Sequence, residues 1–302
     1  MCGIVGFLAK DAALQDTLGE FLVPMLTCMG ERGPDSAGLA VFSAPLPASK
    51  RRFSLWTRDW HFDWASLGRR LAADTGAQAD LGPLENHAIL ISTVPVGLLH
   101  AWLDQQFPGV HLLSAGRSID LYKDEGHPAE IARRYEFSRL AGTHGIGHTR
   151  MATESAVSPA HAHPFTAGED FCLVHNGSLS NPCSIRRRLE KQGIAFETDN
   201  DTEAACRFLE WRMTGGETLE QALAAAFKEL DGFYTLLMAT TDRMVLVRDR
   251  FACKPAVVAE TAAYVAVGSE YRALAHLPDI RHARLFEPAP EQIYSWTAPA
   301  SA

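Results

Sequence analysis

The second residue of the chain carries the side chain with the greatest chemical promise. Cys2 directly follows Met1, and removal of that methionine would leave a thiol and a free α-amino group on one Cα. A free α-amine has a pKa of about 7.7–8.0, so near neutral pH much of it can accept a proton. Such an amine can act as general base for its own side chain. Cys2 is therefore a candidate nucleophile, although alone it would be read as an incidental small apolar residue.

Cys2 is accompanied by short polar motifs that follow one another along the chain. They are Arg32-Gly-Pro-Asp-Ser-Ala-Gly38, Gly147-His-Thr-Arg-Met-Ala-Thr153, His161-Ala-His-Pro-Phe165, Val174-His-Asn-Gly-Ser178 and Thr198-Asp-Asn-Asp-Thr-Glu203. Each motif alone is a weak signal. Together, in this order and behind Met-Cys-Gly-Ile-Val-Gly, they resemble the class II glutamine amidotransferases, which are N-terminal-nucleophile hydrolases. The resemblance covers residues 1–43 and 141–270.

The resemblance implies an enzyme that hydrolyses L-glutamine to glutamate and ammonia through a γ-glutamyl thioester. It assigns the nucleophile to Cys2 and the oxyanion hole to the side chain of Asn176 and the backbone N–H of Gly177. A tetrahedral intermediate needs two fixed donors of this kind, and loss of one costs roughly 10²–10³ in rate. Glycine suits position 177 because its backbone must approach the substrate closely.

The resemblance also implies a binding site for a free amino acid. Arg150 would hold the α-carboxylate of glutamine, since a guanidinium can donate two parallel hydrogen bonds. Asp201 would accept the α-ammonium group, and Ala152 and Thr153 would lie in a loop that covers the substrate. Arg32, Gly33 and His163 have supporting roles.

Two features bear on the expected activity: a substitution near the substrate, and the fate of Met1. Several relatives have Arg-Trp-Ala-Thr-His-Gly where this chain has Arg150-Met-Ala-Thr-Glu-Ser155. Glu154 thus replaces a histidine near the substrate, which affects the expected affinity for glutamine rather than the nucleophile. If Met1 is retained, the amine is blocked and the enzyme is an inactive, unprocessed form.

Two other functional classes remain open. A histidine-ligated metal hydrolase is one, because His144, His148, His161, His163 and His175 fall close together and such clusters can bind zinc. The glycines between His144 and His148 disfavour a helix there, however, and no glutamate stands between them as general base, so we predict no metal. The second is a catalytically silent subunit with a structural or regulatory role. Every mapped catalytic position is intact, which argues against this alternative.

The sequence leaves no room for an ammonia-accepting domain, so we expect the acceptor on a partner subunit in a hetero-oligomer. The chain most resembles the separate glutaminase-type subunit of glutamate synthase-related complexes, with N-methylglutamate synthase as the most specific candidate. Any flavin or iron–sulfur cofactor would then belong to partner chains. We predict no cofactor in this chain, because its scattered cysteines do not suit a cluster.

The elements that must position these residues follow from hydrophobic periodicity and turn signals. Helices are predicted over 14–29, 64–73, 97–107, 128–137, 182–192, 201–214 and 219–230. Strands are predicted over 2–8, 39–42, 87–93, 110–115, 233–240, 244–248, 256–259 and 264–268. The expected fold class is α+β, a four-layer αββα sandwich of two antiparallel sheets between helices. Residues 1–302 form one amidotransferase domain, with an α/β insertion or subdomain over 44–140.

The composition of the chain restricts the kinds of partner it can bind and the cellular compartment we expect for it. The 302 residues carry a formal charge of −8. Among the short basic runs, Arg186-Arg187-Arg188 stands out, and we expect it on an exposed helix face. We therefore predict no nucleic-acid binding. The longest apolar run, 88–99, is broken by a proline and too short to cross a bilayer, and no signal peptide is apparent. Six cysteines without CxxC spacing favour free thiols and the cytoplasm.

Overall fold

The computed structural model describes residues 2–152 and 157–299. Within these ranges the strands form three sheets, and every recorded pairing is antiparallel. The first sheet has the order β15-β13-β14-β1-β8-β2-β7. Its strands are β1 (Gly3–Ala9), β2 (Ser36–Phe42), β7 (Ile119–Glu125), β8 (His144–Arg150), β13 (Val257–Glu260), β14 (Tyr264–Gly268) and β15 (Arg284–Phe286).

The second sheet has the order β16-β12-β11-β10-β9. Its strands are β9 (Phe165–Thr166), β10 (Phe171–Leu179), β11 (Gly232–Thr240), β12 (Arg243–Arg248) and β16 (Tyr294–Thr297). The helices of the molecule are α1 (Ala12–Gln15), α2 (Leu18–Cys28), α3 (Trp64–Thr75), α4 (Val96–Gln106), α5 (Pro128–Arg134), α6 (Pro182–Glu190), α7 (Asp201–Thr214) and α8 (Leu219–Glu229).

Strand β1 shows why the first two sheets lie face to face. Val5 and Phe7 pack into the core that includes residues of α2, whereas Ile4 and Leu8 pack into a second core shared with β10 and β11. Successive side chains of a strand point to opposite faces of its sheet. Both faces of β1 are therefore buried, which is why its sequence is a continuous apolar run.

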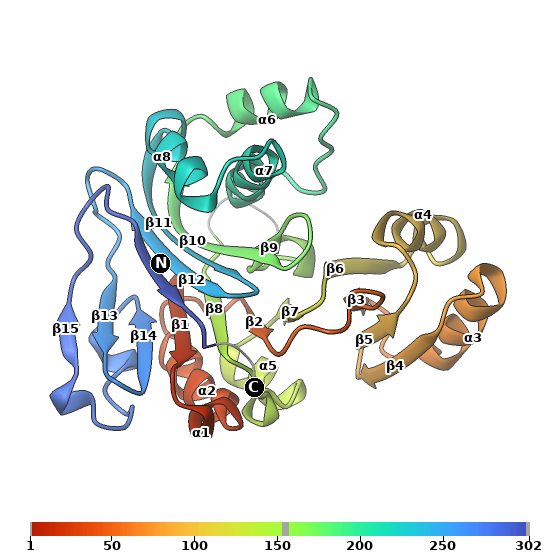
Figure 1. Ribbon diagram of the computed structural model, residues 1–302, viewed down its shortest axis with the longest axis horizontal. Helices are drawn as coiled ribbons and strands as arrows, with labels where there is room; N and C mark the ends of the chain where they lie inside the picture. The colour runs from red at the N-terminus through yellow and green to blue at the C-terminus, as the bar shows by residue number, and fades with distance from the viewer. Residues whose placement is uncertain (1, 153–156, 300–302) are drawn as a thin grey trace.

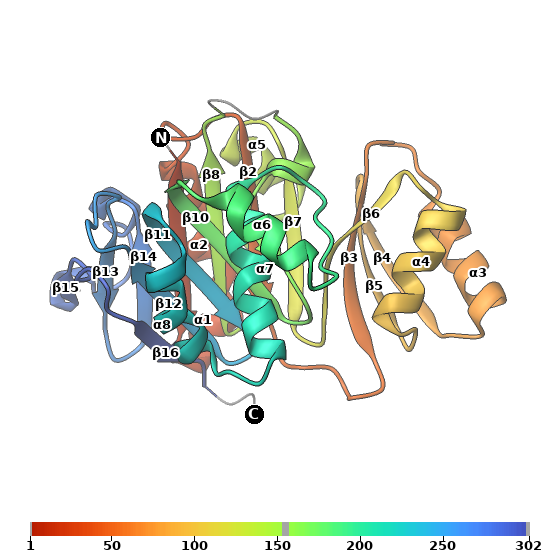
Figure 2. The same ribbon diagram turned by 90° about the horizontal axis from the view of Figure 1, so that it is seen from above.

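Helices close the two outer faces of this pair of sheets. Helices α2 and α5 pack on the first sheet, and α7 and α8 pack on the second around a separate apolar core. Figures 1 and 2 show the resulting order of helices, sheet, sheet and helices. The predicted α+β fold, a four-layer αββα sandwich, is confirmed.

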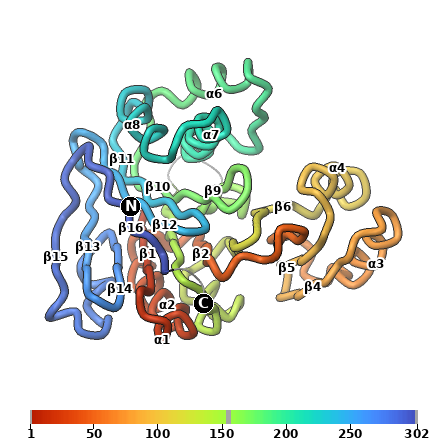
Figure 3. Tube along the Cα trace, in the orientation of Figure 1, coloured from red at the N-terminus to blue at the C-terminus, as the bar shows by residue number. Residues whose placement is uncertain are grey.

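The third sheet lies to one side of this sandwich, as the Cα trace makes clear (Figure 3). It has the order β4-β5-β3-β6, with strands β3 (Arg51–Thr57), β4 (Ala79–Leu84), β5 (His87–Ser92) and β6 (Val110–Gly116). Helices α3 and α4 cover it around its own core. The next strand, β7, pairs with β2 in the first sheet. The segment that stands apart thus runs from 51 to 116, and the end of the expected 44–140 insertion belongs to the sandwich.

Strand β8 lies inside the first sheet, between β1 and β2, although the sequence predicted no strand there. Its glycines explain both the omission and the packing. A Cβ at Gly145 would lie 2.8 Å from Leu22 Cδ1, and one at Gly147 would lie 3.1 Å from Leu26 Cδ1. Helix α2 can approach the sheet this closely only because those side chains are missing. None of the helices in the described ranges has the length and apolar character to cross a membrane.

Candidate active site

Cys2 lies immediately before β1, and two side chains from distant parts of the chain hold its main-chain oxygen. Arg32 Nε donates to this oxygen over 2.9 Å and Asn176 Nδ2 donates over 3.2 Å. Arg32 is buried and also forms an ion pair with Glu270, which the sequence did not single out. The position of Cys2 is therefore fixed by the loop between α2 and β2, which carries Arg32, and by the second sheet, which carries Asn176. Glu270, after β14, holds Arg32 in place.

Five of the predicted site residues line one pocket of about 470 Å³: Cys2, Arg150, His163, Gly177 and Asp201. They come from the residue before β1, the end of β8, the segment before β9, strand β10 and the first residue of α7. A volume of this size is typical of small-molecule sites, which span about 300–1,000 Å³. The pocket is further lined by Met151, His175, Ser178, Leu179, Pro182, Asp199, Asn200 and Thr202.

The backbone at Gly177 has a conformation and a close contact that both require glycine. Its φ is +150°, and an added Cβ would lie 2.1 Å from the Phe233 carbonyl oxygen. Any side chain here would push β10 away from β11. The preceding residue, Asn176, uses its amide to contact Cys2. An amide nitrogen carries two N–H groups, so this contact occupies one donor and leaves the other.

Arg150 is buried at the end of β8, where the loop after β8 begins. Gly33 packs directly on this point, since an added Cβ would lie 2.5 Å from the Arg150 nitrogen. Ala152 follows, and its N–H donates to Asp35 Oδ2 over 2.8 Å. The motif that contains Arg32 and Gly33 therefore supports the segment that carries Arg150. Thr153 and Glu154 lie outside the described residues.

Asp201 begins α7 with its carboxylate directed to the pocket. Burial by itself raises its pKa, but the nearby His175 ring, at 3.7 Å, and hydrogen bonds from the Leu179 N–H and from Thr202 outweigh burial and hold the pKa at about 2. The Leu179 N–H contact measures 2.9 Å. Asp201 is therefore an anion throughout the neutral range, as a partner for an ammonium group must be.

The expectation that Arg186 lies on an exposed helix face is wrong. Arg186 donates from α6 to the carbonyl oxygens of Thr198 and Asn200, over 2.7 and 2.5 Å. These oxygens belong to the loop that leads into Asp201. A guanidinium supplies several donors in one plane, so Arg186 can hold both carbonyls and fix the approach to α7.

Three histidines pack together at the pocket, and two of them contact the Thr202 hydroxyl group. His163 Nε2 and His175 Nδ1 lie 2.8 and 2.9 Å from Thr202 Oγ1, and the His163 ring stacks on His148 with centroids 4.0 Å apart. Burial lowers the pKa of His148 to about 3 and lowers that of His163 well below its ordinary value. Both are therefore neutral, hydrogen-bonding residues. Across the described ranges, no three His, Cys, Asp or Glu side chains are grouped to hold a metal ion.

Several functional contacts escaped the sequence analysis. Glu270 lies 238 positions from the Arg32 that it pairs with, and no local pattern links them. Asp35 and Thr202 could have been found, because both lie inside motifs that already stood out. Their roles, holding Ala152 and orienting two histidines, depend on contacts that only the folded chain reveals.

Comparisons with known proteins agree with this geometry. A family model for the glutamine amidotransferase domain matches residues 148–276. The chain is 47% identical over 297 residues to the glutamine amidotransferase-like protein GlxB of Rhizobium meliloti, with 98% of both chains covered. It is 32% identical over 304 residues to a putative glutamine amidotransferase of Methanothermobacter thermautotrophicus, covering 97% of this chain and 99% of that one. The chain belongs to the class II glutamine amidotransferase family.

Solved structures show the same fold. The glutamine phosphoribosylpyrophosphate amidotransferase from B. subtilis, complexed with ADP and GMP, superimposes with a TM-score of 0.62 at 19% identity. The allosteric regulatory enzyme of purine biosynthesis gives a TM-score of 0.64, also at 19% identity. The matches cover 98% and 97% of this chain but 49% and 46% of those chains. The chain thus spans about half the length of these two structures.

Proposed function

We propose that this chain is a glutaminase that hydrolyses L-glutamine to glutamate and ammonia, with Cys2 as nucleophile after removal of Met1. The observation that carries the proposal is the pocket shared by Cys2, Arg150, Gly177 and Asp201. It brings a thiol, a cation, an anion and a closely approaching backbone N–H to one cavity. These four groups match the reacting amide and the zwitterionic end of glutamine.

The charged ends of the pocket select a free amino acid. The Arg150 guanidinium binds the α-carboxylate, and the Asp201 carboxylate, ionised down to a pH of about 2, binds the α-ammonium group. A glutamine inside a peptide has neither charge on its α-groups. It would offer no charged α-group to Arg150 or Asp201, so it would forgo the charge-assisted hydrogen bonds that bind the free amino acid.

The chemistry proceeds in two halves. The α-amine of Cys2 takes the thiol proton, and Sγ attacks the glutamine Cδ to form a tetrahedral intermediate. The negative oxygen of this intermediate accepts hydrogen bonds from the second N–H of Asn176 and the backbone N–H of Gly177. Transfer of the proton to the leaving nitrogen breaks the C–N bond and releases ammonia. Water, deprotonated by the same amine, then cleaves the γ-glutamyl thioester to give glutamate and the free thiol.

We further propose that the ammonia passes to an acceptor on a partner subunit, as in glutamate synthase-related complexes, N-methylglutamate synthase among them. Flavin or iron–sulfur chemistry would belong to that partner. All six cysteines of this chain are free thiols, which supports a reducing compartment, and we propose the cytoplasm.

An exposed aromatic–cationic surface made of Phe233, Arg250, Phe251 and Lys254 supports a partner. Phe251 and Phe233 are 61% and 41% exposed, and the Arg250 guanidinium and the Lys254 ammonium lie 4.7 and 5.0 Å from their ring centroids. The Phe233 carbonyl is also the atom against which Gly177 packs. Exposed aromatic groups of this kind mark interaction sites. Two cations on a chain of net charge −8 suit an acidic face of the acceptor subunit.

Replacement of the nucleophile tests the proposed hydrolysis. Cys2→Ala should abolish glutamate production from glutamine while the melting temperature stays close to that of the wild type, because Cys2 makes its recorded contacts through its main chain. Cys183→Ala is the matched control, since Cys183 is exposed. Turnover by Cys2→Ala at the wild-type rate would refute the assignment.

A further inference from the structure

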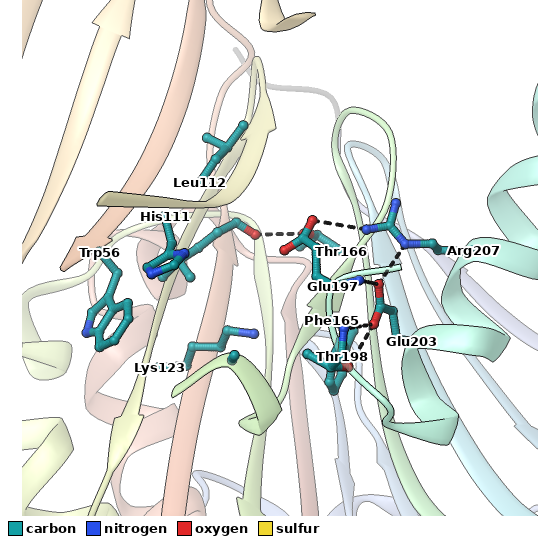
Figure 4. A pocket seen from close by; sticks show the side chains of 12 residues that line it. Trp56, His111, Leu112, Lys123, Phe165, Thr166, Glu197, Thr198, Glu203 and Arg207 are labelled. Atoms are coloured by element: carbon teal, nitrogen blue, oxygen red, sulfur yellow. Dashed lines mark hydrogen bonds and ion pairs between the residues drawn. The ribbon is translucent and has the colours of Figure 1, made fainter. Parts of the chain in front are cut away.

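A second cavity, of about 90 Å³, lies where the third sheet meets the sandwich, apart from the pocket that contains Cys2. Figure 4 shows Trp56 and His111 of the third sheet on one side and Phe165, Thr198 and Arg207 of the sandwich on the other. Between them lies Lys123 of β7. A water molecule's share of liquid volume is about 30 Å³, so the space admits a molecule of only a few non-hydrogen atoms.

Lys123 is a buried cation without a bonded counter-ion. Its side chain is 5% exposed, and Nζ donates to the carbonyl oxygens of Ala162 and Pro164 over 2.9 and 3.3 Å. No carboxylate of the described residues lies within ion-pairing distance of this nitrogen. An ammonium group has three donors. The third has no recorded acceptor among the described residues and lies at the cavity, where Nζ is 4.8 Å from the centroid of the Phe165 ring. Burial lowers the pKa of Lys123 to about 8, which shows how poorly its charge is compensated.

The two carboxylates near the cavity differ in how firmly they are held. Glu203 is 2% exposed and is satisfied by Glu197 N, Thr198 N, Thr198 Oγ1 and Arg207 Nε at 2.7–2.8 Å. The Glu197 side chain is 66% exposed and has one recorded partner, Arg207 Nη2, at 3.1 Å. The Glu197 side chain can therefore turn into solvent at little cost in free energy. Glu203 and Arg207 then neutralise each other, and the cavity keeps the positive charge of Lys123.

We propose that this cavity is a binding site for a small carboxylate, which displaces the Glu197 side chain and pairs with Lys123 and Arg207. The carboxylate would accept the remaining Lys123 N–H and the Arg207 Nη2–H that Glu197 now occupies. The rings of Phe165 and Trp56 would flank its short carbon chain. A compound of four to six non-hydrogen atoms suits the cavity, of roughly three water volumes.

The site touches two supports of the glutamine pocket. The carbonyls bound by Lys123 flank His163, which lines that pocket. Thr198 and Glu203 lie on either side of the Asp199–Asp201 segment, which lines it as well. Occupancy should therefore alter glutamine binding. This coupling rests on the proposed glutaminase function, whereas carboxylate binding does not.

Acetate and acetamide form a matched pair of probes, equal in size and different in charge. Their dissociation constants for the full chain can be measured by ligand-observed NMR titration without glutamine. We expect acetate to bind at least tenfold more tightly than acetamide. Lys123→Met should abolish this preference, and Lys228→Met, the same change at an exposed position, should preserve it. Equal binding of the two probes to the wild type, or an acetate preference retained in folded Lys123→Met, overturns the site.

Glu197→Gln provides a test that does not depend on the folding of Lys123→Met, because the Glu197 side chain is mostly exposed. Loss of the Glu197 charge removes the carboxylate that competes with the ligand for Arg207. Acetate should therefore bind about threefold more tightly, and the affinity for acetamide should not change. An unchanged acetate affinity contradicts the displacement. Acetate should also shift the KM for glutamine in the wild type and not in Lys123→Met. If acetate binds without changing the KM for glutamine, the coupling to the glutamine pocket is overturned and the carboxylate site stands.

Discussion

The side-chain nitrogen of Asn176 lies 3.2 Å from the main-chain oxygen of Cys2, across 174 positions of sequence. The contact joins strand β10 of the second sheet to the residue before β1 of the first sheet, beside the pocket that both sheets line. We therefore propose two functions for Asn176: one N–H positions Cys2, and the other is offered to the oxyanion.

Asn176→Ala should lower kcat for glutamine hydrolysis by roughly 10²–10³, the usual cost of losing one oxyanion donor. Asn176→Asp should lose at least as much, because a carboxylate donates nothing and repels the developing negative charge. Steady-state kinetics measure both, and circular dichroism checks that each variant is folded. A kcat of Asn176→Ala within threefold of the wild type would remove Asn176 from the oxyanion hole.

Arg150→Ala should act mainly on KM. A hydrogen bond to a charged group contributes about 1.5–3 kcal/mol, so KM for glutamine should rise roughly 10- to 100-fold, with a smaller change in kcat. Arg150→Lys should recover only part of this loss, since an ammonium group cannot donate two parallel bonds. Arg187→Ala, at an exposed helix position, is the control. A KM unchanged in Arg150→Ala would count against the clamp.

Stability should fall in mild acid because of the buried histidines. Burial lowers the pKa of His148 from its ordinary 6.5 to about 3, so between these values the unfolded chain binds a proton that the folded chain excludes. The free energy of unfolding should therefore fall as pH drops below about 6.5, by up to ~1.4 kcal/mol per pH unit for each such histidine.

The contribution of one histidine to this acid sensitivity can be isolated by urea unfolding at pH 7.5 and pH 5. His148→Asn should show a smaller loss of stability between the two pH values than the wild type, and His61→Asn, at an exposed position, should show the wild-type loss. An identical pH dependence in the wild type and His148→Asn would mean that His148 can be protonated in the folded state.

The aromatic–cationic surface around Phe251 predicts that glutamine hydrolysis and partner docking can be separated. Phe251→Ser should leave glutamine hydrolysis by the isolated chain within about twofold, because the Phe251 ring is 61% exposed and lies outside the pocket. In the assembled complex the same change should weaken subunit association and glutamine-dependent synthesis, while synthesis from added ammonia persists. Tyr271→Ser, at another exposed aromatic position, serves for comparison. Undiminished association of Phe251→Ser would exclude this surface as the docking site.

The sequence predicted which residues lie together in the pocket better than it predicted the scaffold that positions them. Cys2, Arg150, Gly177 and Asp201 stood out because each lies in a motif whose residue types match one part of the reaction, and the structure places them together. Their roles stay predictions. The four layers were also predictable, since a strand such as β1 with both faces apolar must be covered on both sides.

Other features depend on contacts that no local pattern encodes. Strand β8 escaped notice because Gly145 and Gly147 weaken the strand signal, and only the closeness of α2 explains them. Arg186 looked like part of a solvated basic run, yet it binds backbone carbonyls beside Asp201. In both cases the deciding partner lies elsewhere in the chain, and propensity is a weak guide where tertiary contacts decide.

The most direct test of the account is the intact mass of the protein after reaction with a cysteine-directed glutamine analogue. We predict a chain that lacks Met1 and carries one adduct. Peptide mapping should place the adduct on Cys2, and excess glutamine should prevent its formation. A chain that retains Met1 and still hydrolyses glutamine, or a protectable adduct on Cys28, Cys183 or Cys253 instead, would contradict it.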